Sequence, residues 1–377
     1  MKIVYVIDSL ANQGGVERIV LNKTEYMTKH FGYDISIITC YQNDEMPNSF
    51  PVPDGVKQIR LGIPFYSQYH YRYPYRLVVK NRLARQLQYA IETTIQRIDP
   101  DILVFVKSDV FFHVKCRAKV VFEGHEPRPF TFSNYGLSRG TVTGWYMKYY
   151  RRQFFRQVER QADVVVALTQ GDAFEWRKVK RVEVIPNFTK MPIVSISDTM
   201  TKRAIAVGRF EWVKGYDQLI DAWKIVSEKH PDWHLDLFGG GKLEQELKQQ
   251  QERLGLQDYL SINPGTSTIN EEYAKSSLFV ASSHFEGFPL VLLEAMQVGL
   301  PCVAFDCRFG PSAVIDDGVN GFLVPEGDVA GLAEKICRLI EDDKMRQRFS
   351  QAALEKSKQF AVDVVMARWK KLFESLL

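Results

Sequence analysis

Short apolar runs alternate with longer amphipathic stretches along the whole chain. In the first half the apolar runs are residues 2–7, 34–40, 59–61, 101–106, 119–124, 163–168 and 182–187. Two long helical stretches are predicted between them, at about 16–30 and 76–97. Strands that are apolar almost throughout, rather than at every second residue, are typical of a parallel sheet that helices cover on both faces.

The pattern pauses after this first series and then restarts. Residues 188–201 have no periodicity and contain Pro192 and a polar cluster, which predicts a linker. The strands predicted beyond it are residues 204–208, 234–239, 259–263, 278–283 and 301–305. The helices predicted among them are about 216–229, 242–254 and 290–298, and a final amphipathic helix is predicted at 362–377.

Two such series predict an α/β protein with two Rossmann-like, doubly wound domains that face each other across a cleft. We expect one domain over residues 1–188 and a second over 189–361, and a length of 377 residues suits two domains. Ligands bind at the carboxyl ends of the strands in such sheets, so the cleft is the expected site.

Composition narrows the class of protein. The apolar fraction of 45% and the charged fraction of 25% are those of a soluble globular protein. No apolar run approaches the ~20 residues that cross a bilayer, and the first run ends at Asp8, too early for a signal peptide. We therefore expect a cytoplasmic protein. The cysteines match no common zinc or redox spacing and are expected to be reduced thiols: Cys40, Cys116, Cys302, Cys307 and Cys337.

The charge is unevenly distributed. Residues 1–190 hold 28 Lys and Arg against 18 Asp and Glu, a net +10, whereas the remainder holds 21 against 27, a net −6. In the first half, residues 65–86 and 145–160 mix Arg and Lys with Tyr, Trp and Phe. Basic aromatic helices can bind an anionic membrane surface, but a core helix with a solvated basic face has the same pattern. No nucleic-acid-binding module accompanies the charge, so no nucleic-acid partner is expected.

The strongest functional pattern lies in residues 284–305. Glu286 is in a Gly- and Pro-containing loop after a predicted strand, and a helix is predicted to begin near Leu290. The N–H groups and the dipole at a helix start favour a diphosphate. Glu294 lies about one turn into that helix, where its carboxylate could accept two hydrogen bonds from a ribose diol. Two glutamates at this spacing, taken alone, are more often solvated acids.

A second strand–loop–helix pattern spans residues 206–223, with Arg209 and Lys214 in the loop. Two cations at one strand end could neutralise a diphosphate leaving group without a metal ion. No cluster of His, Cys, Asp and Glu has metal-ligand spacing, so we expect no metal and no cofactor other than a nucleotide-linked co-substrate.

These two segments resemble glycosyltransferase family 4, a family of retaining transferases with the GT-B fold. Glu286 and Glu294 match its Glu-x7-Glu motif, including the intervening GFPLVLL, and Val207-Gly208-Arg209 with Lys214-Gly215 match its VGR…KG pattern. The resemblance implies that Glu286 holds the transferred sugar, that Glu294 binds the ribose, and that Arg209 and Lys214 hold the diphosphate.

The same resemblance assigns roles to further residues. His125 would lie beside the reacting sugar, although a lone histidine is more often structural, and Asn187 would line the cleft. The remaining donor-binding positions are implied to be Gly14, Gly15, Gly208, Gly239, Gly240, Gly265, Gly287, Phe288, Pro289 and Leu290. For the glycines, turn geometry alone is the alternative explanation. The resemblance also implies that the helix at 362–377 returns to complete the first domain.

The implied activity is the metal-independent transfer of a hexosyl or N-acetylhexosaminyl unit from a nucleotide diphosphate sugar to a glycan. The Gly-Pro-Ser triplet at 310–312 resembles a subset of the family that uses UDP-sugars in bacterial glycan synthesis. A lipid-linked acceptor in cell-surface polysaccharide synthesis would suit the basic first half and place the enzyme on the inner membrane face. Two alternatives remain open: a nucleotide-sugar epimerase of the same fold, and a non-catalytic, membrane-associated scaffold subunit.

Asp99 and Asp101 form a literal Asp-x-Asp, the metal-binding motif of a different glycosyltransferase fold. Pro100 separates them, and they lie between a predicted helix and a buried strand. We interpret them as a turn.

Overall fold

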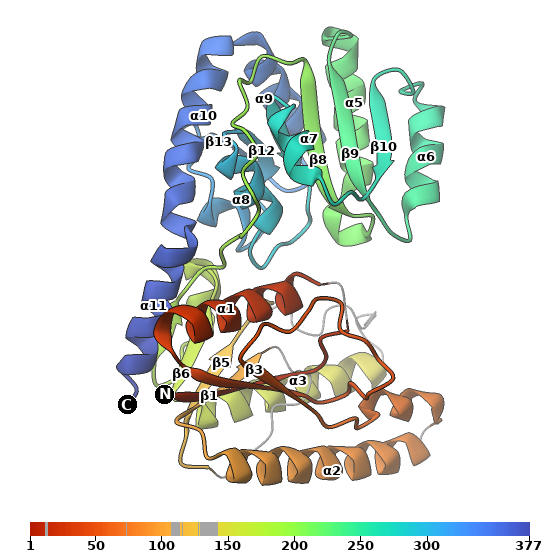
Figure 1. Ribbon diagram of the computed structural model, residues 1–377. Helices are drawn as coiled ribbons and strands as arrows, with labels where there is room; N and C mark the ends of the chain where they lie inside the picture. The colour runs from red at the N-terminus through yellow and green to blue at the C-terminus, as the bar shows by residue number, and fades with distance from the viewer. Residues whose placement is uncertain (12–13, 73, 107–113, 115, 127, 129–141) are drawn as a thin grey trace. The chain divides into compact units, whose positions relative to one another are not determined.

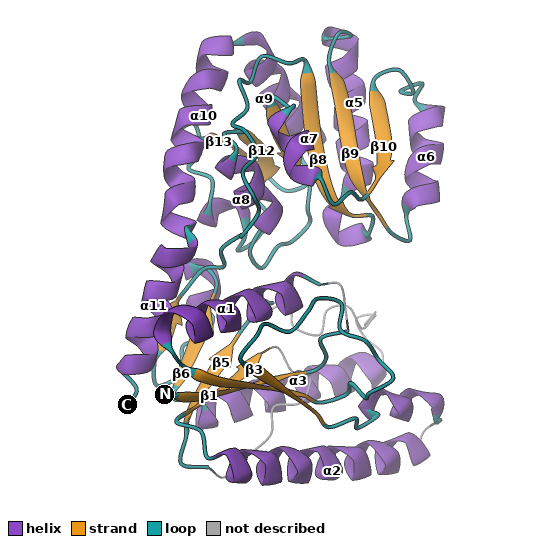
Figure 2. Ribbon diagram, in the orientation of Figure 1, coloured by secondary structure: helices purple, strands orange, loops and turns teal. Residues whose placement is uncertain are grey.

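A computed structural model describes residues 1–11, 14–72, 74–106, 114, 116–126, 128 and 142–377. The chain forms two compact units. The first contains Met1–Ile185 and Met366–Leu377, and the second contains Pro186–Val365. Each unit has one parallel sheet with helices on both faces (Figures 1 and 2).

The sheet of the first unit has seven parallel strands in the order β3-β2-β1-β4-β5-β6-β7. They are β1 (Lys2–Ile7), β2 (Asp34–Thr39), β3 (Val56–Arg60), β4 (Ile102–Val106), β5 (Lys119–Glu123), β6 (Val164–Ala167) and β7 (Val182–Val184). Each of them overlaps a predicted strand. The prediction placed β3 too late because this edge strand is only partly buried and has few apolar residues at its start.

The helices of this unit cover both faces of the sheet. They are α1 (Gly15–Phe31), the 3-10 helix η1 (Phe65–His70), α2 (Tyr75–Ile98), α3 (Val142–Gln161), α4 (Gln170–Ala173) and the part of α11 (Val362–Glu374) from Met366 onward. Leu87 of α2 and Phe154 of α3 share a buried cluster with Val4 and Val6 of β1. Tyr5, which points to the opposite face, donates to the Met27 Sδ of α1. Alternate strand residues thus serve two helix layers, as a doubly wound sheet requires.

The second unit has a six-stranded parallel sheet in the order β10-β9-β8-β11-β12-β13. Its strands are β8 (Arg203–Arg209), β9 (His234–Gly240), β10 (Leu260–Pro264), β11 (Leu278–Ala281), β12 (Cys302–Phe305) and β13 (Gly321–Val324). Its helical segments are η3 (Trp212–Lys214), α5 (Tyr216–Lys229), α6 (Glu244–Arg253), α7 (Ile269–Ala274), α8 (Leu290–Gln297), η4 (Pro311–Ala313), α9 (Val329–Glu341), α10 (Asp343–Ser357) and η5 (Lys358–Phe360).

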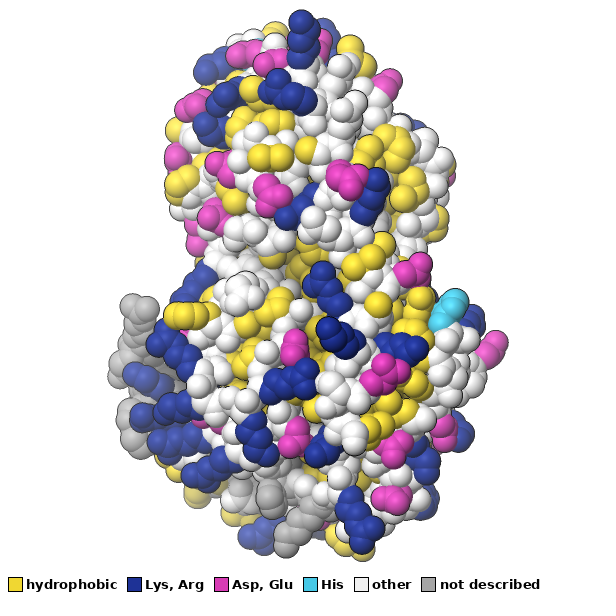
Figure 3. Space-filling model, turned by 90° about the vertical axis from the view of Figure 1, so that its left-hand side faces the viewer, with side chains coloured by type: hydrophobic (Ala, Val, Ile, Leu, Met, Phe, Trp, Pro, Cys, Tyr) yellow, Lys and Arg dark blue, Asp and Glu magenta, His cyan; other side chains and the backbone are white. Residues whose placement is uncertain are grey.

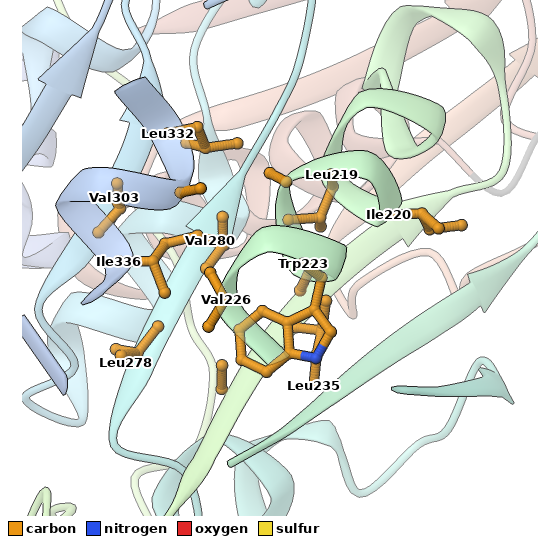
Figure 4. Close-up of a cluster of buried hydrophobic side chains, with 14 of the residues drawn as sticks. Leu219, Ile220, Trp223, Val226, Leu235, Leu278, Val280, Val303, Leu332 and Ile336 are labelled. Atoms are coloured by element: carbon orange, nitrogen blue, oxygen red, sulfur yellow. The ribbon is translucent and has the colours of Figure 1, made fainter. Parts of the chain in front are cut away.

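A cluster around Trp223 forms the core on one face of this second sheet. The indole is fully buried, and its Nε1 donates to the Tyr259 carbonyl at 2.7 Å. Figure 4 shows apolar side chains from α5, α9 and the central strands packed around it: Leu219, Ile220, Val226, Leu235, Leu278, Val280, Val303, Leu332 and Ile336. This packing fixes the strands whose ends carry the candidate site.

Several sequence predictions are confirmed by local geometry. Asp99 ends α2 in the left-handed region (φ 50°), and Asp101 accepts a hydrogen bond from the Lys2 backbone N–H at 2.7 Å, so the Asp-x-Asp is a turn. Gly299 follows α8 with a φ of 80°, the left-handed conformation in which glycine commonly ends a helix. All five cysteines are free thiols.

None of the helices that the structure describes is long and apolar enough to cross a membrane.

Candidate functional site

The strand order brings the two main motifs together. In the second sheet the chain runs outward from β8 to β10 and then returns to place β11 on the other side of β8. The loop after β8 carries Lys214, and the loop after β11 carries Glu286. Ligands of open parallel sheets bind at such a reversal of strand order, where neighbouring loops diverge.

Lys214 and Glu286 form an ion pair at this point. The Lys214 Nζ lies 2.6 Å from the Glu286 Oε1, and each side chain is 16% exposed. The Ser283 hydroxyl donates to the same Oε1 at 2.8 Å, and the Ser282 hydroxyl donates to the Lys214 carbonyl at 2.9 Å. The cation and the carboxylate expected to hold different parts of a substrate are thus in contact and mutually oriented.

Gly215 allows this close approach. Its φ is 58°, and an added Cβ would overlap the Ser282 carbonyl oxygen. Only glycine combines a left-handed backbone with contact against another strand end at low cost. Gly215 of the Lys-Gly dipeptide therefore has a structural role, in addition to the chemical role expected of Lys214.

The other residues after β8 and β9 differ in their surroundings. Arg209 ends β8 with an exposed side chain. Gly208 pairs with Gly239 of β9, and a Cβ on Gly239 would overlap the Gly208 carbonyl oxygen, so strand packing requires glycine there. Gly240, and Gly265 after β10, have open space where a side chain would be.

The helix α8 begins at Leu290, as predicted. Phe288 and Pro289 are buried before it, and Pro289 provides no side-chain cap for the first N–H groups. Gly287 precedes them in the same partly buried loop, directly after Glu286. The N–H groups of Leu290, Leu292 and Leu293 donate to the carbonyls of Phe288 and Pro289, so the feature of this helix start that favours an anion is its dipole.

Glu294 lies within α8 and is only 5% exposed. Its Oε2 accepts a hydrogen bond of 3.4 Å from the hydroxyl of Tyr273, on α7. Burial, and then the Glu294 charge, raises the pKa of Tyr273, so the phenol stays a donor. No sequence pattern distinguishes Tyr273 from other aromatic residues of the chain.

The candidate residues of the first unit follow β1 and β5. Gly14 is the N-cap of α1, with the Glu17 carboxylate where its side chain would be, and Gly15 is the first helical residue. His125 follows β5 and is 8% exposed, with its Nε2 2.8 Å from the Glu123 Oε1.

Glu123 belongs to a buried charge network. Lys23 of α1 also forms an ion pair with the Glu123 Oε1, and both side chains are 1% exposed. The Lys23 ammonium lies 4.4 Å from the ring centroid of Trp369 on α11 and 5.8 Å from that of Tyr5. The returning helix α11 therefore covers a buried cation with an aromatic face.

The neighbouring charges keep Glu123 ionised. Burial acts to raise the pKa of Glu123, but the charges and hydrogen bonds of Lys23 and His125 outweigh it and lower the pKa to about 2. Burial lowers the pKa of Lys23, and Glu123 opposes that shift. An ionised Glu123 orients the His125 ring at neutral pH. Lys23 was not predicted, although a lysine between Val20 and Met27 on the buried side of α1 is a recognisable signal.

Asn187 is 7% exposed and lies at the start of the second unit. Among the residues described here, no group of three or more His, Cys, Asp or Glu side chains is placed to hold a metal ion.

Two α/β units with parallel sheets, one of which carries a Lys–Glu pair where its strand order reverses, define a protein of the GT-B class. Residues 13–190 match the sequence family described as Glycosyltransferase Family 4, and residues 188–356 match Glycosyl transferases group 1. The chain therefore belongs to the family 4 glycosyltransferases, and the predicted fold class is confirmed.

Known relatives agree with this assignment. An uncharacterized glycosyltransferase of Haemophilus influenzae is 27% identical over 376 residues, covering 98% of this chain and 99% of the relative. The amylovoran biosynthesis glycosyltransferase AmsD of Erwinia amylovora is 30% identical over 218 residues, covering 55% and 61%. The match covers only 24% to 61% of the length of AmsD and of two other relatives. The crystal structure of S. aureus TarM, at 16% identity, has a TM-score of 0.76 and covers 99% of each chain, which shows the shared fold.

Proposed function

We propose that the protein is a retaining, metal-independent glycosyltransferase that moves a hexosyl or N-acetylhexosaminyl unit from a UDP-sugar to a glycan acceptor. The observation that carries the proposal is the Lys214–Glu286 pair at the strand-order reversal, close in sequence to the uncapped start of α8. A cation and the positive end of a helix dipole suit a diphosphate, and a carboxylate suits the hydroxyl groups of a sugar.

Lys214 can bind Glu286 and the diphosphate at the same time. Its ammonium has three donors, and one is directed to Glu286, so the others can bind phosphate oxygens. Arg209 adds a second cation, and the N–H groups of α8 add a dipole. Charge that develops on the leaving diphosphate is then stabilised by fixed groups, which is the role a metal ion has in other transferases.

In the proposed reaction the bond from the anomeric carbon to the diphosphate oxygen breaks as the acceptor hydroxyl attacks from the same face. The bond to the acceptor oxygen forms, and a leaving phosphate oxygen takes the acceptor's proton. Glu286 orients the transferred sugar through its hydroxyl groups. His125 orients it as well, with its ring held by Glu123 at 2.8 Å. Protein groups thus act by positioning and by charge stabilisation.

The acceptor is proposed to be a lipid-linked glycan in cell-surface polysaccharide synthesis. Relatives named for related tasks support this class: AmsD in amylovoran biosynthesis, and the poly(ribitol-phosphate) alpha-N-acetylglucosaminyltransferase of Staphylococcus aureus, 26% identical over 215 residues.

The function is tested by thermal-shift screening against UDP-, GDP- and ADP-sugars, followed by transfer assays with EDTA. We expect stabilisation by a UDP-sugar, undiminished transfer in EDTA, and a product with the donor's anomeric configuration by NMR. An isomerised nucleotide sugar formed without acceptor would instead identify an epimerase. A protein that binds none of these nucleotide sugars would fit the scaffold alternative.

Glu294 is proposed to bind the ribose diol. Glu294→Gln should weaken UDP binding by about 1–3 kcal/mol, because a charge-assisted hydrogen bond is lost at a nearly buried position. Isothermal titration calorimetry measures the change, and Glu246→Gln, at an exposed site on α6, is the control. An unchanged UDP affinity in Glu294→Gln would contradict the ribose contact.

The first unit is proposed to bind an anionic membrane surface. Along η1 and the start of α2 the structure exposes Tyr66, Tyr69, Tyr71, Tyr75, Arg72, Arg82 and Arg85. Tyr73 and the side chains of residues 145–147 and 150 lie outside the described residues. Figure 3 draws the side of the first unit away from η1, and Lys and Arg side chains are numerous on that side as well. Exposed tyrosines beside arginines suit the headgroup region of a bilayer.

Sedimentation with vesicles tests this contact. We expect binding to vesicles with anionic phospholipid that weakens as salt rises, and weaker binding by Arg82→Ala/Arg85→Ala. Lys224→Ala/Lys248→Ala, which removes two cations from the second unit, should bind like the wild type. Equal binding to neutral vesicles would contradict the proposal.

A further inference from the structure

Trp212 is the exception among the tryptophans whose side chains the structure describes. Trp176, Trp223, Trp233 and Trp369 are at most 5% exposed, whereas Trp212 is 64% exposed. It opens η3, two residues before Lys214. Single exposed apolar residues are common on protein surfaces. An exposed indole needs an explanation only if the protein also fixes its orientation.

A stacking contact on one face of the indole fixes its orientation. The Trp212 ring stacks on the His284 imidazole, with centroids 4.5 Å apart and planes at 14°. The His284 Nδ1 lies 3.2 Å from the Glu326 Oε1, and the His284 side chain is 12% exposed. The backbones are joined too, since the His284 N–H donates to the Val213 carbonyl at 2.9 Å. One face of the indole is therefore supported, and the ring remains largely open to solvent.

The supporting residues place this platform on one side of the sheet. His284 follows β11 and Glu326 follows β13, which is an edge strand, whereas β10 is at the opposite edge. The loop after β10 begins with Gly265, one of the expected donor-binding positions. Trp212 and His284 lie two residues before Lys214 and Glu286 on the same two loops, so the platform adjoins the sugar end of the expected diphosphate site.

We propose that Trp212, backed by His284 and Glu326, stacks against a pyranose ring of the acceptor glycan. A pyranose ring has an apolar face of C–H groups, and an indole gives a large flat surface with little conformational entropy to lose. The Glu326 carboxylate is 45% exposed and can accept hydrogen bonds from hydroxyl groups at the ring's edge. The inference rests on the proposed transferase function and deepens it by naming a glycan-binding residue.

Steady-state kinetics with the UDP-sugar found by screening and a panel of oligosaccharide acceptors test the platform. Trp212→Ala should raise the acceptor KM about tenfold, the effect expected for loss of an aromatic contact, and leave UDP affinity within about twofold. Trp212→Phe should retain most of the acceptor affinity. Phe174→Ala, at an equally exposed aromatic (65%) on the first unit, should leave the acceptor KM unchanged.

An unchanged acceptor KM in Trp212→Ala would overturn the proposal, and so would an equal loss of UDP affinity, which would make Trp212 a support for the donor loop. A second readout is independent of turnover. In protein labelled with 5-fluorotryptophan, the ¹⁹F signal that Trp212→Phe removes should shift when methyl glycosides are added. If the wild type neither binds nor transfers a nucleotide sugar, the proposed function fails, and this signal still decides whether Trp212 binds saccharide: no shift overturns the inference.

Discussion

Replacing Lys214 with alanine is expected to lower kcat by about 10²–10³-fold. This is the range for losing one preorganised group that stabilises charge in a transition state. The Lys214 ammonium lies 2.6 Å from the Glu286 Oε1, and Gly215 lets its loop pack against the Ser282 carbonyl, so this charge is held in place before the substrate binds. Donor and acceptor saturation kinetics would separate the change in kcat from changes in KM.

Two controls make this result interpretable. Lys248→Ala removes a cation from an ion pair on α6 and should leave kcat unchanged. Lys214→Ala also leaves Glu286, 16% exposed, without its cation, so melting curves must show that the variant is folded at the assay temperature. A folded Lys214→Ala variant with near-wild-type kcat would refute the role given to Lys214.

The second large effect is on stability, at the buried pair of Lys23 and Glu123. Lys23→Met should destabilise the protein by about 3–5 kcal/mol, because it leaves a buried carboxylate without its cation. Lys23→Met/Glu123→Gln should recover most of this loss, since neither charge then remains buried alone. Urea unfolding measures both. Lys29→Met, on the exposed side of the same helix, should change the free energy of unfolding by less than about 0.5 kcal/mol.

The pH dependence follows from the lowered pKa of Glu123. A carboxyl whose folded-state pKa is about 2 contributes stability above its unfolded pKa of about 4.3, and that stability is lost as the pH falls toward 2. Glu123→Gln should therefore flatten the change in stability between about pH 4 and pH 2. An equally steep acid dependence in Glu123→Gln and the wild type would show that other carboxyl groups dominate.

Periodicity predicted most of the elements because they are long or apolar throughout. The helix predicted at 216–229 is α5, and α8 begins at the predicted Leu290. The structure adds β13, α9 and α10, which were not predicted. The two helices did have a local signal at their starts. Asp328 caps α9 and Asp342 caps α10, because their side chains accept hydrogen bonds from the N–H groups of Gly331 and Met345.

The features that could not be predicted from the sequence depend on contacts between residues that are far apart along the chain. Lys23 and Glu123 are 100 residues apart, and Trp369 reaches them from the last helix. The adjacency of β8 and β11, which joins Lys214 to Glu286, is a property of strand order, and no periodic pattern encodes it. The motif names the candidate residues, and the fold adds side chains that contact them: Ser283, Tyr273 and Glu123.

The central claim is that the carboxyl ends of β8 and β11 bind a nucleoside diphosphate between a cation and a carboxylate. A crystal structure of the protein with a non-hydrolysable UDP-sugar tests it most directly. We expect the diphosphate within hydrogen-bond distance of Lys214 and Arg209, the ribose on Glu294 and the sugar on Glu286. A nucleotide bound elsewhere, with Lys214 and Glu286 paired only to each other, would contradict the account.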